Sequence, residues 1–158
     1  MKKFVACLLF AAMVNITDSN AQTDDAKAKL NLGVNLAPQM VYQFGAEKPS
    51  GNLGIFFAAG LSTKSAGVTG FYGSGHNLGL FIYKNTSPKT ALYSVYLNNL
   101  HNTGQYIGAG AMHGLGSVGE WFSASAFVEA GIPFGQEKQD PIICAGLFLG
   151  FSKLIKKW

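Results

Sequence analysis

Residues 141–158 read PIICAGLFLGFSKLIKKW, and from Ile143 onward two rows of side chains alternate. The odd-numbered row is continuously apolar from Ile143 to Phe151, whereas the even-numbered row combines small residues with Phe148. A period of two residues indicates a β-strand, because successive side chains of a strand point to opposite faces. Lysines follow this strand, and the sequence ends at Trp158.

The same alternation recurs towards the N-terminus, in segments separated by short polar or glycine-rich turns. Together with the last strand it predicts strands over residues 30–44, 53–61, 68–72, 78–83, 91–97, 106–113, 122–132 and 143–152. Residues 115–120 are expected to turn the chain. The pairing registers stay open around Pro38, which cannot donate to a ladder, and around residues 68–72, which are short and interrupted by glycine.

Eight strands are an even number, so the last can pair with the first and leave no free edge. Strands of about ten residues with alternating hydrophobicity and short turns are typical of small transmembrane barrels. The sequence therefore predicts an all-β fold: an eight-stranded antiparallel up-and-down transmembrane β-barrel that follows a cleaved signal peptide.

The signal peptide is predicted from the first residues. Lys2 and Lys3 precede an apolar run over residues 4–14, which is too short to span a bilayer as a helix. A small-x-small cleavage site ends at Ala21. We expect a signal peptide over residues 1–21, a flexible N-terminal segment over 22–29 and the barrel domain over 30–158.

Composition narrows the class of protein. Only 13% of the residues are charged, which is low for a soluble secreted domain but suits a barrel whose outer face is covered by lipid. Every basic residue is lysine. Because arginine is the side chain that usually makes bidentate hydrogen bonds to phosphate and guanine, we expect no nucleic-acid partner. Cys144 is the only cysteine after the leader, so the mature domain forms no internal disulfide.

With these features the chain resembles the small bacterial outer-membrane β-barrel proteins. A final strand that ends in an aromatic residue is similar to the C-terminal signature of that family, with Trp158 in place of the more usual Phe. The resemblance implies a monomer in the outer membrane, in contact with outer-membrane lipid. It implies a non-enzymatic envelope, adhesion or host-interaction role, in which a surface partner would meet the loops at residues 45–52, 73–77, 98–104 and 133–141.

Other folds share part of this pattern. Alternating strands with glycine-rich turns also describe a β-sandwich or a soluble, secreted or periplasmic, lipocalin-like ligand-binding barrel. In such a barrel the apolar rows would line a cavity, and the outer face would be poorly solvated glycine, alanine, serine and phenylalanine. Residues 104–119 also fit a glycine-zipper helix, although their flanking glycines and the expected turn favour a strand.

An enzyme is the remaining alternative, because a serine, a histidine and a carboxylate near one rim form a hydrolytic triad. Ser74, His76, His101 and Glu129 are the weak candidates: we expect both histidines near the extracellular rim and Glu129 in the upper half of its strand. Small outer-membrane barrels include lipid A deacylases and palmitoyltransferases. The chain lacks the local His-x-Ser pairing of the former and the amphipathic N-terminal helix of the latter.

Glu129 is the one ionisable side chain expected inside a strand, on the lumen face. A buried charge needs a partner, so a lysine, a tyrosine such as Tyr96 or Tyr106, or water should satisfy it. We expect side chains to fill the narrow lumen, which argues against an open pore. No histidine or cysteine pair has metal-ligand spacing, and we expect neither a metal nor a cofactor.

Overall fold

The computed structural model describes residues 28–101, 104–119, 121–135 and 140–157, so the predicted signal peptide lies outside the described residues. Within these ranges the chain is all-β. The strands are β1 (Lys29–Gln43), β2 (Ser50–Ser62), β3 (Ala66–Gly73), β4 (Asn77–Asn85), β5 (Thr90–Asn99), β6 (Gln105–Val118), β7 (Phe122–Phe134) and β8 (Ile142–Lys157). No helix in the described part of the chain is long and apolar enough to cross a membrane.

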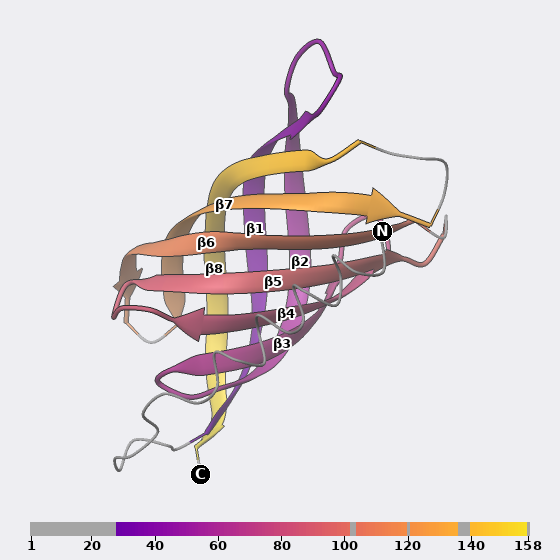
Figure 1. Cartoon of the computed structure of the whole chain (residues 1–158). Coiled ribbons are helices and arrows are strands. Elements are labelled where there is room, and N and C mark those ends of the chain that lie inside the picture. The colour runs from indigo at the N-terminus through magenta and orange to yellow at the C-terminus, as the bar shows by residue number, and fades with distance from the viewer. Residues whose placement is uncertain (1–27, 102–103, 120, 136–139, 158) are drawn as a thin grey trace.

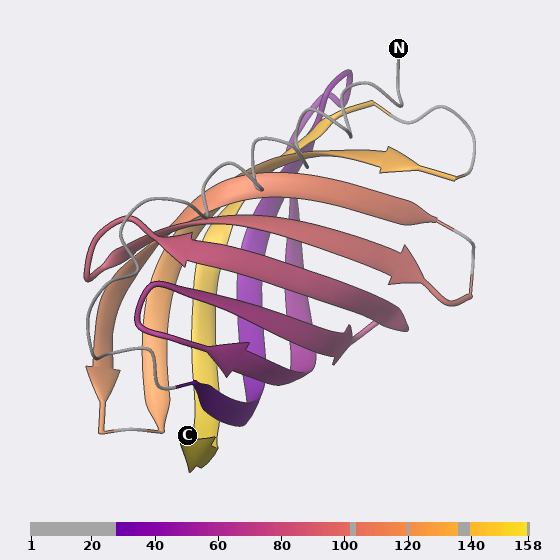
Figure 2. The same cartoon turned by 60° about the horizontal axis from the view of Figure 1, so that its bottom comes forward.

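The eight strands form one closed antiparallel barrel (Figures 1 and 2). Each strand pairs with its neighbours in sequence, and β1 also pairs with β8, so the sheet has no free edge. Val34 of β1 shows this closure, because it pairs with Phe57 of β2 on one side and with Phe151 of β8 on the other. In Figure 1, β1, β2 and β8 run across the direction of β4 to β7, as strongly tilted strands of opposite barrel walls do. The predicted up-and-down barrel is confirmed.

The chain passes Pro38 without leaving β1, but the pairing of β1 with β8 is interrupted there. Leu36 pairs with Leu149 and Gln39 pairs with Gly146, and the two residues between Leu36 and Gln39 have no partner in β8. The ladder with β2 continues through Pro38. The interruption follows from the missing N–H group of proline, and the register is intact on both sides of it.

Most strands are longer than the sequence pattern predicts, and β8 continues to Lys157, five residues past its expected end. β3 extends one or two residues beyond the expected range of 68–72 at each end. β6 continues to Val118, so the turn expected over residues 115–120 was wrong at its N-terminal end. A register shift between Gly114 and Gly116 leaves Leu115 without a partner in β7. This bulge absorbs the extra residue, and the strand continues where the glycines suggested a turn.

Side chains alternate between the outside of the barrel and its lumen. On β8, Ile143 and Phe151 are exposed on the outside, whereas Cys144 is buried inside. On β5 both rows are apolar: Leu92 is half exposed on the outside and Tyr93 is buried in the lumen. Apolar character alone therefore does not identify the outer row of β5, although closure of the barrel does.

Glycines on the inner face accommodate aromatic rings. A Cβ atom at Gly79 would overlap the ring of Phe71, and one at Gly131 would overlap the ring and hydroxyl of Tyr106. The same relation joins Gly54 and Gly73 to Phe56, and Gly67 to Tyr83. Because each ring occupies the space that a side chain would fill, the rings lie along the wall of the barrel rather than across its centre.

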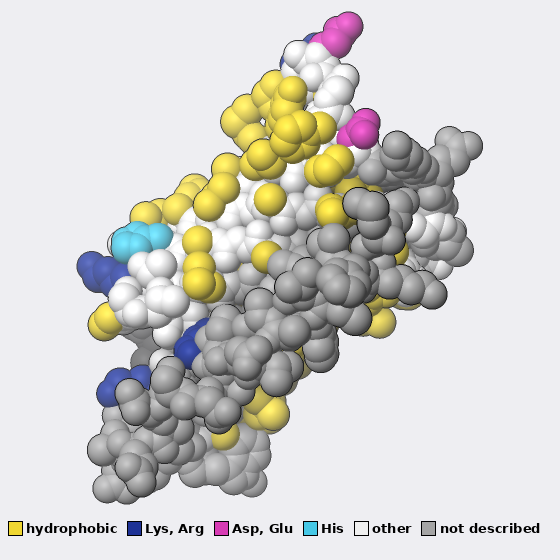
Figure 3. All heavy atoms as spheres, in the orientation of Figure 1, with side chains coloured by type: hydrophobic (Ala, Val, Ile, Leu, Met, Phe, Trp, Pro, Cys, Tyr) yellow, Lys and Arg dark blue, Asp and Glu magenta, His cyan; other side chains and the backbone are white. Residues whose placement is uncertain are grey.

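The two ends of the barrel differ in charge. We call the end of the barrel at which β1 begins and β8 ends the terminal rim. The opposite end, which has the β1–β2, β3–β4, β5–β6 and β7–β8 connections, is the distal rim. Among the residues whose side chains the structure describes, charges at or near the terminal rim are Lys29, Lys64, Lys84, Lys89 and Lys153, and those at the distal rim are Glu47, Lys48 and Asp140. Figure 3 shows acidic side chains at one end, lysines at the other, and hydrophobic side chains between them.

Candidate functional site

The lumen contains a cavity of about 740 Å³, so its side chains fill only part of it. The expectation of a filled lumen was wrong, because the inner rings lie against glycines and small residues such as Ala37, Ala58 and Ser125 line the wall between them. The lining runs from Asn77 and Pro133 near the distal rim to Asn85 near the terminal rim. A cavity of this volume is in the range of small-molecule sites.

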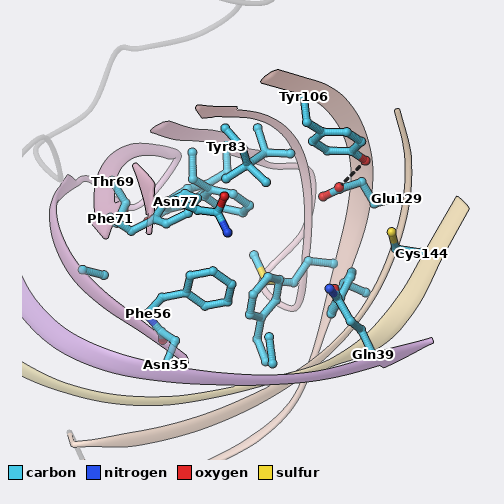
Figure 4. A pocket seen from close by; sticks show the side chains of 18 of the residues that line it. Asn35, Gln39, Phe56, Thr69, Phe71, Asn77, Tyr83, Tyr106, Glu129 and Cys144 are labelled. Atoms are coloured by element: carbon cyan, nitrogen blue, oxygen red, sulfur yellow. Dashed lines mark hydrogen bonds between the residues drawn. The ribbon is translucent and has the colours of Figure 1, made fainter. Parts of the chain in front are cut away.

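The lining is mainly apolar and aromatic, with amide side chains near both ends (Figure 4). Its aromatic members are Phe56, Phe71, Phe81, Tyr83, Tyr106, Phe127 and Phe148, and its amides are Asn35, Gln39, Asn77, Asn85, Asn99 and Gln105. Glu129 is the only carboxylate, and none of the described lining residues is basic.

Glu129 projects from β7 into this cavity, as the alternation along β7 predicts (Figure 4). The Tyr106 hydroxyl of β6 donates a hydrogen bond to Glu129 Oε1 at 2.6 Å. Tyr106 was one of the predicted partners, and this prediction is confirmed. Tyr96 lies on the outer face instead, with its ring centroid 6.5 Å from that of Phe134.

A second tyrosine approaches the same carboxylate. Tyr93 of β5 lies against Gly110, the residue of β6 that pairs with Glu129. The Tyr93 hydroxyl is buried and has no hydrogen-bond partner in the described part of the chain. Cys144 of β8, whose thiol is free, pairs with Glu129 on its other side. Two phenols, a carboxylate and a thiol thus come together from four adjacent strands.

The two candidate histidines meet at the distal rim. The rings of His76 and His101 are perpendicular, with centroids 4.0 Å apart, although they belong to different connections. His76 Nδ1 shares a hydrogen bond of 2.8 Å with the Tyr72 hydroxyl. The backbone N–H of Leu100 donates to the carbonyl of His76, which holds the two connections together.

Ser74 lies in the same β3–β4 connection as His76 but has a backbone partner. Its hydroxyl accepts a hydrogen bond from the N–H of Ile55 at 3.2 Å. Among the described residues, no hydrogen bond joins Ser74 to either histidine or joins a histidine to Glu129. The structure thus brings His76 and His101 together at the rim, while Glu129 is engaged by Tyr106 in the lumen.

His113 lies at the other end of the barrel, where Nδ1 is 3.0 Å from Thr90 Oγ1. Within the described ranges, no group of three or more histidine, cysteine, aspartate or glutamate side chains is arranged to hold a metal ion. The cavity is the feature that sequence reasoning missed. The sequence feature that could have indicated the cavity is the frequency of glycine beside aromatic residues in the inward-facing rows. An aromatic ring can lie over such a glycine and so stay against the wall of the barrel.

No protein-family model matches the sequence, and no curated protein or solved structure is significantly similar to it.

Proposed function

We propose that the chain is a small bacterial outer-membrane barrel with a non-enzymatic role at the cell envelope. The observation that carries this proposal is the outer face of the closed barrel. Large apolar side chains are exposed on every strand, including Leu53, Phe57, Leu80, Leu92 and Val128. A soluble monomer rarely exposes contiguous apolar surface of this extent, whereas a bilayer solvates it.

The ends of the barrel support the same placement. Exposed aromatic side chains lie close to the strand ends, among them Tyr42, Phe44, Tyr72, Trp121 and Phe134. Aromatic residues are enriched where a membrane barrel crosses from hydrocarbon to water. On the outer face, the charges of the described residues are at or near the rims, and Glu129, which lies deeper in a strand, faces the lumen. A closed sheet also leaves no backbone edge facing lipid.

The distal rim would then face the outside of the cell. The β1–β2 hairpin projects beyond the rest of the barrel at the top of Figure 1, and its connection includes Glu47 and Lys48. The connection between β3 and β4 is held to that between β5 and β6 by the hydrogen bond from Leu100 to His76. A projecting hairpin beside a fixed pair of connections suits contact with a surface partner, as in an adhesion or host-interaction role.

Fractionation of cells that express the full chain tests the placement. We expect the protein in the outer-membrane fraction, and we expect its mobility on a gel in SDS to change when the sample is boiled, because a closed barrel resists unfolding by the detergent. An abundant soluble protein of the same cells, which should be absent from the outer-membrane fraction, serves as the fractionation control. Recovery of the folded protein in the periplasm or the medium without detergent would instead support the soluble ligand-binding barrel.

The enzymatic alternative makes a separate prediction at Ser74. We expect Ser74→Ala to leave the lipid A of an overexpressing strain unchanged, and to lower the free energy of unfolding by about 1 kcal/mol because Ile55 loses its hydrogen-bond acceptor. Mass spectrometry of lipid A and denaturant unfolding measure the two effects. If lipid A were deacylated in cells that express the wild type but intact in cells that express Ser74→Ala or His76→Ala, the chain would be a hydrolase.

A further inference from the structure

The cavity is a candidate ligand site whose size and walls are already formed. Its volume of about 740 Å³ is close to that of sites that bury a whole drug-sized molecule. The rings of Phe127 and Phe148 lie 4.5 Å apart by their centroids, and those of Phe81 and Tyr93 lie 4.6 Å apart. These rings belong to one hydrophobic cluster with Cys144. Phe81, Phe127 and Phe148 line the cavity as one aromatic wall, and Tyr93 packs against Phe81.

The carboxylate of Glu129 lies next to this wall. Phe127 is the preceding inward-facing residue of the same strand, and Cys144 is the residue that pairs with Glu129 in β8. The Tyr106 hydroxyl occupies one oxygen of the carboxylate, and none of the described lining residues provides a positive charge. A carboxylate in an apolar enclosure without a counter-charge is costly, and a cation in the cavity would remove that cost.

The same arrangement discriminates between classes of ligand. A fatty acid or another anionic amphiphile would bring a second negative charge to a lumen whose described lining contains no base. A neutral apolar molecule would fill the cavity but leave the carboxylate without a counter-charge. An ammonium group attached to an apolar body satisfies both parts of the site, because aromatic faces attract cations as well as apolar groups.

We propose that the lumen binds a hydrophobic amine, with its ammonium group on the Glu129 carboxylate that Tyr106 holds in place and its apolar body against the aromatic wall of Phe81, Phe127 and Phe148. This site does not depend on what surrounds the barrel. It would be present in a membrane barrel and in a soluble one, so its failure and the failure of the outer-membrane proposal are distinguishable.

The test compares three probes that share one ring system. The purified full chain, kept in an uncharged detergent, is titrated with 1-naphthylmethylamine, 1-naphthylmethanol and 1-naphthoate, and empty micelles correct for partitioning into detergent. We expect the wild type to bind the amine at least tenfold more tightly than the alcohol and to bind the carboxylate most weakly. Glu129→Gln, which keeps the size of the side chain and an acceptor for Tyr106, should abolish the preference for the amine and leave alcohol binding unchanged.

Cys144 provides a second measurement that needs no change at the site, because its thiol lines the cavity beside Glu129. The other cysteine of the sequence, Cys7, lies in the predicted signal peptide and is replaced by serine so that only Cys144 can react in any chain that keeps its leader. In this Cys7→Ser variant, the amine should slow alkylation of Cys144 by iodoacetamide at least fivefold at a concentration where the alcohol has no effect. Equal affinities for amine and alcohol, an amine preference that survives in Glu129→Gln, or equal protection of Cys144 by all three probes would overturn the proposal. If Glu129→Gln does not fold, the protection of Cys144 in the wild-type lumen decides.

Discussion

Leu80→Lys is expected to lower the free energy of unfolding in a lipid bilayer by about 2–4 kcal/mol. Leu80 lies in the middle of β4, faces outwards and is 41% exposed. Its partners in the neighbouring strands are Gly70 and Tyr96, so no acidic side chain is directly opposite. A lysine at this level of a membrane barrel must place its ammonium group in hydrocarbon or bend it towards a rim, and both are costly.

The matched control is Leu100→Lys, in which the same replacement occurs in the β5–β6 connection at the distal rim. Leu100 is 56% exposed, and a lysine near the membrane interface should cost about 0–1 kcal/mol. Reversible urea unfolding in phospholipid vesicles, followed by tryptophan fluorescence, measures both variants. Equal and small effects at the two positions would mean that water surrounds the barrel, since exposed surface replacements in water usually change stability by less than about 0.5 kcal/mol.

Gly131→Ala is expected to lower the free energy of unfolding by about 1–3 kcal/mol, the usual cost of overpacking. A methyl group at Gly131 would overlap the Tyr106 ring and hydroxyl and would approach the carbonyl oxygen of Ile107 to 2.6 Å. The Tyr106 ring must then move, and its hydrogen bond to Glu129 lengthens or breaks. The backbone contact with Ile107 cannot relax in the same way, because it belongs to the β6–β7 ladder.

Gly51→Ala is the control for this prediction, because nothing lies within 4 Å of a Cβ atom at Gly51. It should be neutral or stabilise the fold by about 0.4–1 kcal/mol through the unfolded chain. Combining Gly131→Ala with Tyr106→Ala should recover part of the cost, a non-additivity that a double-mutant cycle in the same urea assay detects. Strict additivity would show that the Tyr106 ring does not lie against Gly131.

The glycine positions explain how an eight-stranded barrel keeps space inside. In β3 and β4, Phe71 covers Gly79, and in β6 and β7, Tyr106 covers Gly131. With larger residues at these glycines, the rings would be displaced towards the centre and would close the cavity. The aromatic wall and the space that it borders therefore have the same origin, and variants at these glycines should change ligand binding and stability together.

The site was only partly predictable. The alternation along β7 placed Glu129 in the lumen and identified Tyr106 as one of its partners, because a strand sends every second residue to the same face. Nothing local placed Tyr93 near the same carboxylate, since Tyr93 belongs to β5 and lies against Gly110 of β6, which pairs with Glu129. The contact of His76 with His101 likewise joins two connections that are distant in sequence.

The sequence by itself determined the number of strands, their antiparallel order and, in strands such as β2 and β8, the outer row of large apolar residues. In β5 both rows are apolar, and in β6 glycine and alanine leave neither row distinct. The features that the sequence determined depend on the two-residue period and on short turns, which are local properties of the chain. Tertiary structure alone decided the registers around Pro38, the continuation of β6 past Gly114, and the cavity. These depend on which residues of neighbouring strands lie opposite one another, and closure of the barrel sets that for all eight strands at once.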